Sequence, residues 1–236
     1  MNNAKPILIF DWDCTLAEPR DRSFFSQHRE KTKQSLKDHF DLTPARLEHI
    51  ATSLHERKTR LEKLLSCPDL AREFNLEASR LGQYANLERS LNTIRTDGWF
   101  EPDSELVQAV RGLRNHYNIV VLSNSPEGLI RRIGKAIGFD MDQDFLAYYT
   151  LTAEGGPPKF VDADAAFQTI IQNHAPDLEN SWSLGDSIQT DLEPARKIGM
   201  KTALVDNTGR YEPADHDHTA HGPIKDILDW IAIETP

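Results

Sequence analysis

The segment Ile7-Leu8-Ile9-Phe10 is followed directly by Asp11-Trp12-Asp13-Cys14-Thr15-Leu16. Four consecutive apolar residues predict a strand that is buried on both faces, as in the centre of a parallel sheet. The carboxyl ends of such strands border the crevice in which open α/β sheets bind ligands. Because residues two apart on an extended chain face the same side, we expect Asp11 and Asp13 to converge. Two close carboxylates repel each other unless a cation lies nearby, so the pair predicts either a functional site or a solvated turn.

A second apolar strand is predicted for residues 118–122, and it also ends in polar residues. It runs into Ser123-Asn124-Ser125-Pro126, which provides a hydroxyl group and backbone N–H groups just before a helix begins. Pro suits the first turn of a helix, and a helix N-terminus attracts anions. The segment therefore predicts an anion site, with a simple helix cap as the plainer interpretation.

A third strand of this kind is predicted for residues 181–184, and Gly185-Asp186 follows it. Gly185 permits a close approach of the backbone to another group. We expect Asp186 to face the same crevice as Asp11. Asp191, five residues later, could hold the loop or a metal-bound water in place. Isolated acids are most often caps, but after a strand in a repeated strand–helix pattern they indicate a second acidic arm of the site.

Between these strands, Gly155-Gly156-Pro157-Pro158 leads into Lys159. A lysine at the start of a helix is usually a solvated charge. Here a site that binds an anion needs a cation, and we see no other lysine at a comparable junction near a strand end. The sequence therefore favours Lys159 as that cation.

Taken together, the four segments resemble the four motifs of the haloacid dehalogenase (HAD) superfamily of phosphohydrolases. The order and spacing of all four agree. The matching residues are Asp11, Asp13 and Thr15 in the first motif (DxDx[TV]), Ser123 in the second, Lys159 in the third, and Asp186 with Asp191 in the fourth (GDxxxxD). The chain departs from the pattern at Trp12 and Cys14, where many relatives have Phe and Gly, and at Phe160, where the usual residue is Pro.

This resemblance implies an Mg²⁺-dependent phosphatase that acts on a small phosphomonoester through an aspartyl-phosphate. Asp11 would be the nucleophile, and Asp13 would act as general acid and then general base. The Mg²⁺ ligands would be the Asp11 and Asp186 carboxylates and the Asp13 backbone carbonyl. The phosphate would be bound by Ser123, the Asn124 backbone N–H and Lys159, while Thr15 and Asp191 would support these groups from outside.

Strand and helix patterns alternate from Trp99 onward, which predicts a parallel α/β sheet with helices on both faces. The expected helices contain Leu106–Leu113, Leu129–Ile133, Phe160–His174, Ala195–Ile198 and Ile227–Ile231, and the later strands are Phe145–Leu151 and Thr202–Val205. By resemblance the sheet is Rossmann-like and five-stranded, with order 3-2-1-4-5 and the Asp11 strand in the centre.

Apolar residues between Leu47 and Ile94 keep helical spacing, which predicts a helical insertion directly after the first motif. Its position resembles the helical C1-type cap of the phosphoglycolate phosphatase and β-phosphoglucomutase-like branch. We therefore expect a core domain formed by residues 1–16 and 99–236 and a cap formed by residues 17–98.

The chain has 236 residues, a net charge of −10 and two cysteines, Cys14 and Cys67. The acidic balance argues against a nucleic-acid partner, and the sequence has no signal-peptide pattern and no apolar segment of membrane-spanning length. We expect a cytoplasmic monomer or homodimer without a disulfide or a membrane partner, acting on a small phosphorylated metabolite. His216, His218 and His221 could form a metal site, but a solvated surface segment is the more common case.

Several alternatives stay open. A phosphosugar mutase of the same fold would use the same residues, and a non-catalytic binding module is conceivable although every motif residue is present. Haloacid dehalogenation is disfavoured because Asp13 supplies the acid that dephosphorylation needs, and no cap lysine stands out for phosphonate cleavage. The particular phosphomonoester is not indicated.

Overall fold

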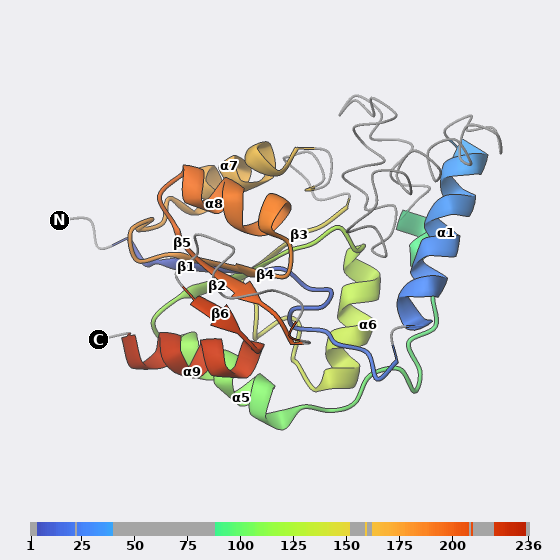
Figure 1. Cartoon of the computed structure of the whole chain (residues 1–236), viewed down its shortest axis with the longest axis horizontal. Helices are drawn as coiled ribbons and strands as arrows, with labels where there is room; N and C mark the ends of the chain where they lie inside the picture. Colours follow the sequence, from blue (N-terminus) through green and yellow to red (C-terminus); the bar gives the residue numbers. More distant parts are fainter. Residues whose placement is uncertain are drawn as a thin grey trace.

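The computed structural model describes residues 4–21, 23–39, 88–151, 159, 162–207, 209 and 220–234. Within them the chain alternates between helices and strands from α5 to β4, as shown in Figure 1. In chain order the elements are β1 (Ile7–Phe10), α1 (Ser23–His39), α5 (Ser104–Leu113), β2 (Asn118–Leu122), α6 (Glu127–Ile137), β3 (Ala147–Tyr149), α7 (Ala163–His174), β4 (Trp182–Gly185), the π-helical turn η2 (Ile188–Leu192), α8 (Glu193–Lys197), β5 (Lys201–Val205), β6 (Ala220–Gly222) and α9 (Ile224–Glu234).

The strands form one sheet in the order β3-β2-β1-β4-β5-β6, with every pair parallel. The predicted parallel α/β fold and the central place of the Asp11 strand are thus confirmed. The count of five strands was incomplete, because β6 adds a sixth strand at the edge. Its sequence, Ala-His-Gly, has no β-branched residue, and all three residues are half-buried, so no apolar pattern marked it.

The central strand is buried on both faces, as its four apolar residues predict. Leu8 and Phe10 belong to a core with α5, α6 and α9 on one face of the sheet, and Ile7 and Ile9 belong to a core with α7 on the other. Figure 1 shows the same layers, with α7 and α8 above the sheet and α5 and α9 below it. Burying each such side chain contributes roughly 1.5–3 kcal/mol, so this strand anchors the site that follows it.

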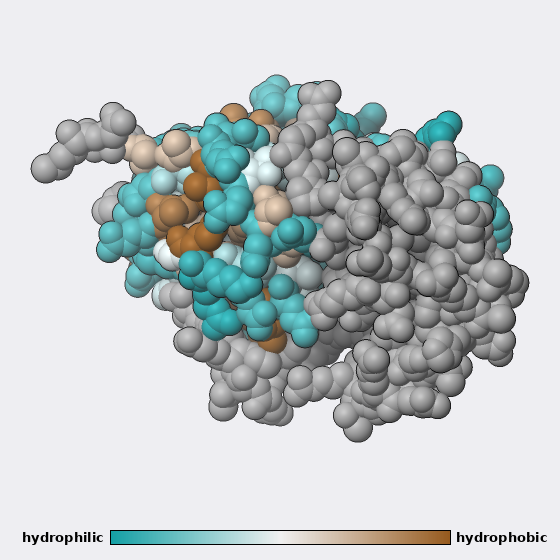
Figure 2. Space-filling view, turned by 90° about the horizontal axis from the view of Figure 1, so that it is seen from above, coloured by the Kyte–Doolittle hydropathy of each residue, from teal (hydrophilic) through white to brown (hydrophobic). Residues whose placement is uncertain are grey.

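The outer surface of the α7–α8 layer is mostly hydrophilic. Figure 2 looks onto this side and shows teal residues interspersed with smaller apolar areas. The buried residues of α7 are Ala166, Phe167 and Ile170, which lie at helical spacing on the face that meets the sheet. Among the helices that the structure describes, none is long and apolar enough to cross a membrane.

Several predicted boundaries shift in the structure. The third strand is shorter than Phe145–Leu151, and the following helix is described from Ala163 rather than Phe160. Asp162 caps this helix, because its side chain accepts a hydrogen bond from the Ala165 N–H, and such a cap marks where the helical hydrogen bonds begin.

The two connections to the predicted cap lie side by side. The Arg20 N–H donates to the Trp99 carbonyl at 2.9 Å, and the Arg20 guanidinium pairs with Glu101. Phe24, at the start of α1, packs against Trp99 and Phe100 with ring centroids 5.8 and 5.0 Å away. Residues 40–87 of the predicted cap lie outside the described residues, so its boundaries stay a prediction.

Candidate active site

The first motif begins where β1 ends. The Asp11 N–H donates to the Leu184 carbonyl at 2.8 Å, so Asp11 continues the hydrogen bonding of β1 with β4. Trp12 is fully buried and packs against Phe139 and Phe145, with ring centroids 6.2 and 6.0 Å away. The buried tryptophan therefore anchors the backbone between Asp11 and Asp13 in the core.

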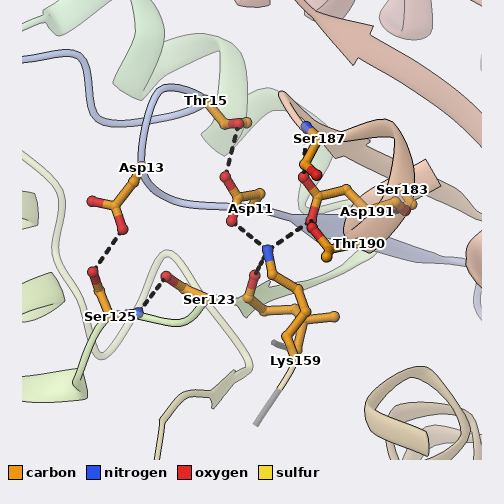
Figure 3. Close-up of polar contacts among 11 residues, drawn as sticks. Asp11, Asp13, Thr15, Ser123, Ser125, Lys159, Ser183, Ser187, Thr190 and Asp191 are labelled. Carbon is orange, nitrogen blue, oxygen red and sulfur yellow. Dashed lines mark hydrogen bonds and ion pairs between the residues drawn. The ribbon is translucent and has the colours of Figure 1, made fainter. Parts of the chain in front are cut away.

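Lys159 lies at the centre of the site, although it is far from the other motifs in sequence. Its ammonium group donates to Asp11 Oδ1 at 2.6 Å, to Asp191 Oδ1 at 2.6 Å and to the Leu122 carbonyl at 3.2 Å. Figure 3 shows it between the two carboxylates. Burial alone would lower the pKa of Lys159, but the two carboxylates raise it above its ordinary value. Lys159 therefore stays charged at any physiological pH.

Three carboxylates lie close together in this site. Oxygen atoms of Asp11, Asp186 and Asp191 lie within 4.8 Å of one another. Burial is the main cause that raises the pKa of Asp191, and it outweighs the lowering effect of Lys159. Close carboxylates of this kind suit a hard divalent cation, which prefers oxygen ligands. The second carboxyl oxygen of Asp11 accepts a hydrogen bond from the Thr15 hydroxyl at 3.1 Å, which fixes its orientation.

The loop that carries Asp191 is built around Gly185. A Cβ atom at this position would lie 2.3 Å from Asp191 Oδ2, which no side chain tolerates. The Ser187 N–H donates to the same carboxylate at 3.0 Å, and the Ser183 hydroxyl donates to the Asp191 carbonyl at 2.8 Å. Asp191 is thus hydrogen-bonded within its own loop, and its carboxylate also contacts Lys159 directly.

Asp13 is held on a different side of the crevice. Its Oδ2 accepts a hydrogen bond from the Ser125 hydroxyl at 2.6 Å, and the Ser125 N–H donates to the Ser123 hydroxyl oxygen at 3.0 Å. In Figure 3 the Asp13 carboxylate points toward Ser125 and away from Lys159. Burial first, and then the charge of Asp11, raises the pKa of Asp13 to about 7. The two acids of the first motif thus lie in different environments.

The sequence interpretation missed two residues near this site. Ser125 lies inside the quoted second segment, but nothing in the pattern linked it to Asp13. Asn207 follows the end of β5, and its amide donates to the Cys14 and Thr15 carbonyls at 3.2 and 3.5 Å. The signal that could have identified Asn207 is its position, because it too follows the carboxyl end of a parallel strand.

The remaining predicted residues are only partly described. Asn124 lies half-buried between the two serines. Of the histidine cluster, His216 and His218 lie outside the described residues. His221 lies in β6, with its Nε2 3.6 Å from Asp206 Oδ2.

Comparisons with known proteins support the same family. A family model described as HAD-hydrolase-like matches residues 163–232, which contain the fourth motif. The comparison with curated proteins finds no match.

Solved structures of HAD proteins share the fold over nearly the whole chain. A 2-haloacid dehalogenase from Pseudomonas syringae pv. Tomato DC3000 is 16% identical with a TM-score of 0.57, covering 98% of this chain and 99% of that one. The HAD-hydrolase YfnB from Bacillus subtilis, in a form bound to magnesium, is 16% identical with a TM-score of 0.54 and coverages of 97% and 98%. A HAD phosphatase from Thermococcus onnurineus is 15% identical with a TM-score of 0.52 and coverages of 96% and 97%.

The family model thus matches the part of the chain that contains the fourth motif, in agreement with the resemblance inferred from the sequence. The family model supports a HAD-type hydrolase, and the structural neighbours support the fold of one.

Proposed function

We propose that this protein is an Mg²⁺-dependent phosphatase that hydrolyses a small phosphomonoester through an aspartyl-phosphate on Asp11. One observation carries the proposal: the two acids that follow β1 have different partners. Asp11 is paired with Lys159, whereas Asp13 is hydrogen-bonded to Ser125. One acid is thus suited to stay ionised and attack, and the other is suited to exchange a proton.

Asp11 has the properties of a nucleophile. Lys159 contacts one carboxyl oxygen and Thr15 contacts the other, so the group is oriented and its negative charge faces a cation. Attack on phosphorus forms an O–P bond to Asp11 and breaks the bond between phosphorus and the leaving oxygen. Each carboxyl oxygen keeps a further lone pair for this step.

Asp13 favours a phosphate ester over an organic halide as the substrate. An alkoxide leaving group must be protonated as it departs, whereas a halide ion leaves without a proton. Asp13 would donate that proton and would then accept one from the water that cleaves the aspartyl-phosphate, which regenerates both acids. A dehalogenase would have no use for this second acid in the first step.

The described residues fit a magnesium ion. Asp11, Asp186 and Asp191 provide hard carboxylate oxygens within 4.8 Å of one another, and their mutual repulsion disfavours the site without added positive charge. We assign the ligands to the Asp11 and Asp186 carboxylates and the Asp13 backbone carbonyl. When bound, Mg²⁺ would neutralise these acids and the phosphate and would polarise the phosphoryl group.

The phosphoryl oxygens would be bound by the Ser123 hydroxyl, the Asn124 N–H and Lys159. Because the Ser123 oxygen already accepts the Ser125 N–H, its own proton is available to the substrate. Lys159 is held by two carboxylates and can share its charge with the phosphate without moving far.

The test is phosphate release from p-nitrophenyl phosphate with Mg²⁺, with and without a chelator. We expect Asp11→Asn to lose at least about a thousandfold in kcat, because it removes the nucleophile. Asp229→Asn, an exposed aspartate on α9, is the matched control and should keep wild-type activity. Activity that survives exhaustive chelation, or Asp11→Asn retaining a tenth of wild-type activity, would refute the proposal. Release of free phosphate also distinguishes a phosphatase from a mutase.

A further inference from the structure

We infer that Ser125 is a positioning residue that aims the Asp13 carboxyl group at the leaving oxygen of the substrate. This inference rests on the proposed function and assigns a task to a residue outside the four motifs. It starts from the contact between the Ser125 hydroxyl and Asp13 Oδ2 at 2.6 Å, which joins positions 112 residues apart.

Asp13 needs such a partner because the neighbouring groups are already engaged. Lys159 contacts Asp11 and Asp191, and the Thr15 hydroxyl contacts Asp11. Within the part of the chain that the structure describes, Ser125 is the one side chain that hydrogen-bonds to the Asp13 carboxylate. Without it, the half-buried Asp13 side chain would rotate about its two side-chain bonds.

Ser125 is itself held firmly. Its side chain is almost completely buried, and its N–H donates to Ser123, which is buried to the same degree. The next residue, Pro126, has a fixed φ of −70° and leads into α6. The hydroxyl is therefore mounted on a rigid turn, which is what a group that orients another side chain requires.

The contact also links two parts of the reaction. Ser123 is proposed to bind the transferred phosphoryl group, and Ser125 connects it to the acid that protonates the leaving group. The phosphate and the proton donor are therefore aligned by one short turn between β2 and α6. Proton transfer by a positioned group contributes about 10²–10⁴-fold to rate, so loss of alignment should cost a sizeable part of that factor.

The experiment compares two esters that differ in their need for the acid. The phenolate of p-nitrophenyl phosphate leaves with little help from a proton, whereas the alkoxide of glycerol 3-phosphate must be protonated. We expect Ser125→Ala to lower kcat/KM at least about tenfold on glycerol 3-phosphate and less than about threefold on p-nitrophenyl phosphate. Because kcat/KM covers cleavage of the ester bond in both cases, the ratio of the two values reports the acid step.

A matched control is Ser181→Ala. Ser181 is also fully buried, and its hydroxyl accepts the Ile7 N–H just before β4, at the end of the sheet opposite the site. Its removal should lower stability without changing the ratio between the two esters. A general effect of losing a buried hydroxyl is thereby separated from an effect on Asp13.

Equal losses on both esters in Ser125→Ala, or no loss on either, would overturn the inference. If Ser125→Ala does not fold, Ser125→Thr and Ser125→Cys replace it, because Thr keeps the hydroxyl and Cys provides only a weak donor. The inference is supported if Ser125→Thr keeps the wild-type ratio of kcat/KM between the two esters while Ser125→Cys shifts that ratio toward p-nitrophenyl phosphate. It is overturned if both variants have the same ratio. A wild-type protein that hydrolyses neither ester with Mg²⁺ refutes the proposed function, and this inference fails with it.

Discussion

Replacing Lys159 with methionine tests the electrostatics of the site through protein stability. The substitution keeps an unbranched apolar side chain of similar length, with sulfur in place of one methylene, and removes the ammonium group. That group contacts Asp11 and Asp191 at 2.6 Å each, and both carboxylates are buried. Lys159→Met therefore leaves two close acids without their shared cation.

The expected cost follows from this geometry. Removing one partner of a buried ion pair costs about 3–5 kcal/mol. We take the lower end, about 3 kcal/mol, because Asp186 in the same cluster is only half-buried and the carboxylates can gain some hydration or a proton. For a chain of this size, the free energy of unfolding falls by about 3 kcal/mol for each molar increase in urea, so the urea concentration at the midpoint of unfolding should fall by about 1 M.

The loss should depend on pH. Burial already raises the pKa of Asp191, and removing Lys159 raises it further. An acid with a raised pKa in the folded state destabilises the fold above that pKa, and protonation relieves the cost as pH falls. The difference between wild type and Lys159→Met should therefore be smaller at pH 6 than at pH 8.

The assay is urea unfolding in the presence of a chelator at both pH values. Lys197→Met is the matched control, since Lys197 pairs with Asp164 on the surface at 2.8 Å and solvent screens that pair. It should leave the midpoint unchanged. A Lys159→Met variant as stable as wild type at pH 8, or a loss that is the same at both pH values, would refute the electrostatic explanation.

Three further predictions concern the supports of the site. Gly185→Ala should destabilise the protein by about 1–3 kcal/mol in urea unfolding, because its Cβ would lie 2.3 Å from a carboxylate oxygen. Gly112→Ala is the control and should be neutral or slightly stabilising, because a Cβ at that helical position would meet no neighbouring group within 4 Å. Asn207→Ala should lower the melting temperature and cost about 1–2 kcal/mol, because the first N–H of α9 loses its acceptor; an unchanged melting temperature would contradict this. Burial raises the pKa of Asp144, but the hydrogen bonds and charge of Arg111, together with the Asp140 N–H and the charge of Arg114, outweigh burial and lower it. The stability that wild type gains over Asp144→Asn should therefore be constant above about pH 5 and shrink as the pH falls below 3.8. A pH-independent difference would exclude these contacts as the cause.

Most of the predicted residues that the structure brings together around Lys159 were marked by a local pattern in the sequence. Apolar runs identified β1, β2 and β4, and the carboxyl ends of parallel strands lie at one edge of a sheet. Polar residues at the ends of different strands could therefore be expected to lie close together in space. Lys159 had no strand to mark it, and it was predicted only because an anion site needs a cation.

Contacts between side chains could not be predicted in the same way. The hydrogen bond between Asp13 and Ser125 depends on the rotamers of two residues and on the turn before α6, and no periodicity contains that information. Gly185 shows the same limit. The sequence predicted a close approach at this position, but the group that approaches is the Asp191 carboxylate from the same loop, since a Cβ would collide with it.

The loop after β1 depends on the C-terminal part of the chain for its shape. Cys14 has a φ of 62°, a left-handed conformation that costs a residue with a Cβ about 1–2 kcal/mol. The Asn207 amide donates to the carbonyls of Cys14 and Thr15, and its oxygen accepts the Ile224 N–H at the start of α9. These hydrogen bonds offset the strain and connect the loop after β1 to the segment after β5 and to α9. The segment after β5 and the start of α9 thus stabilise the geometry of the loop that carries Asp11 and Asp13, although they carry none of the residues proposed to react.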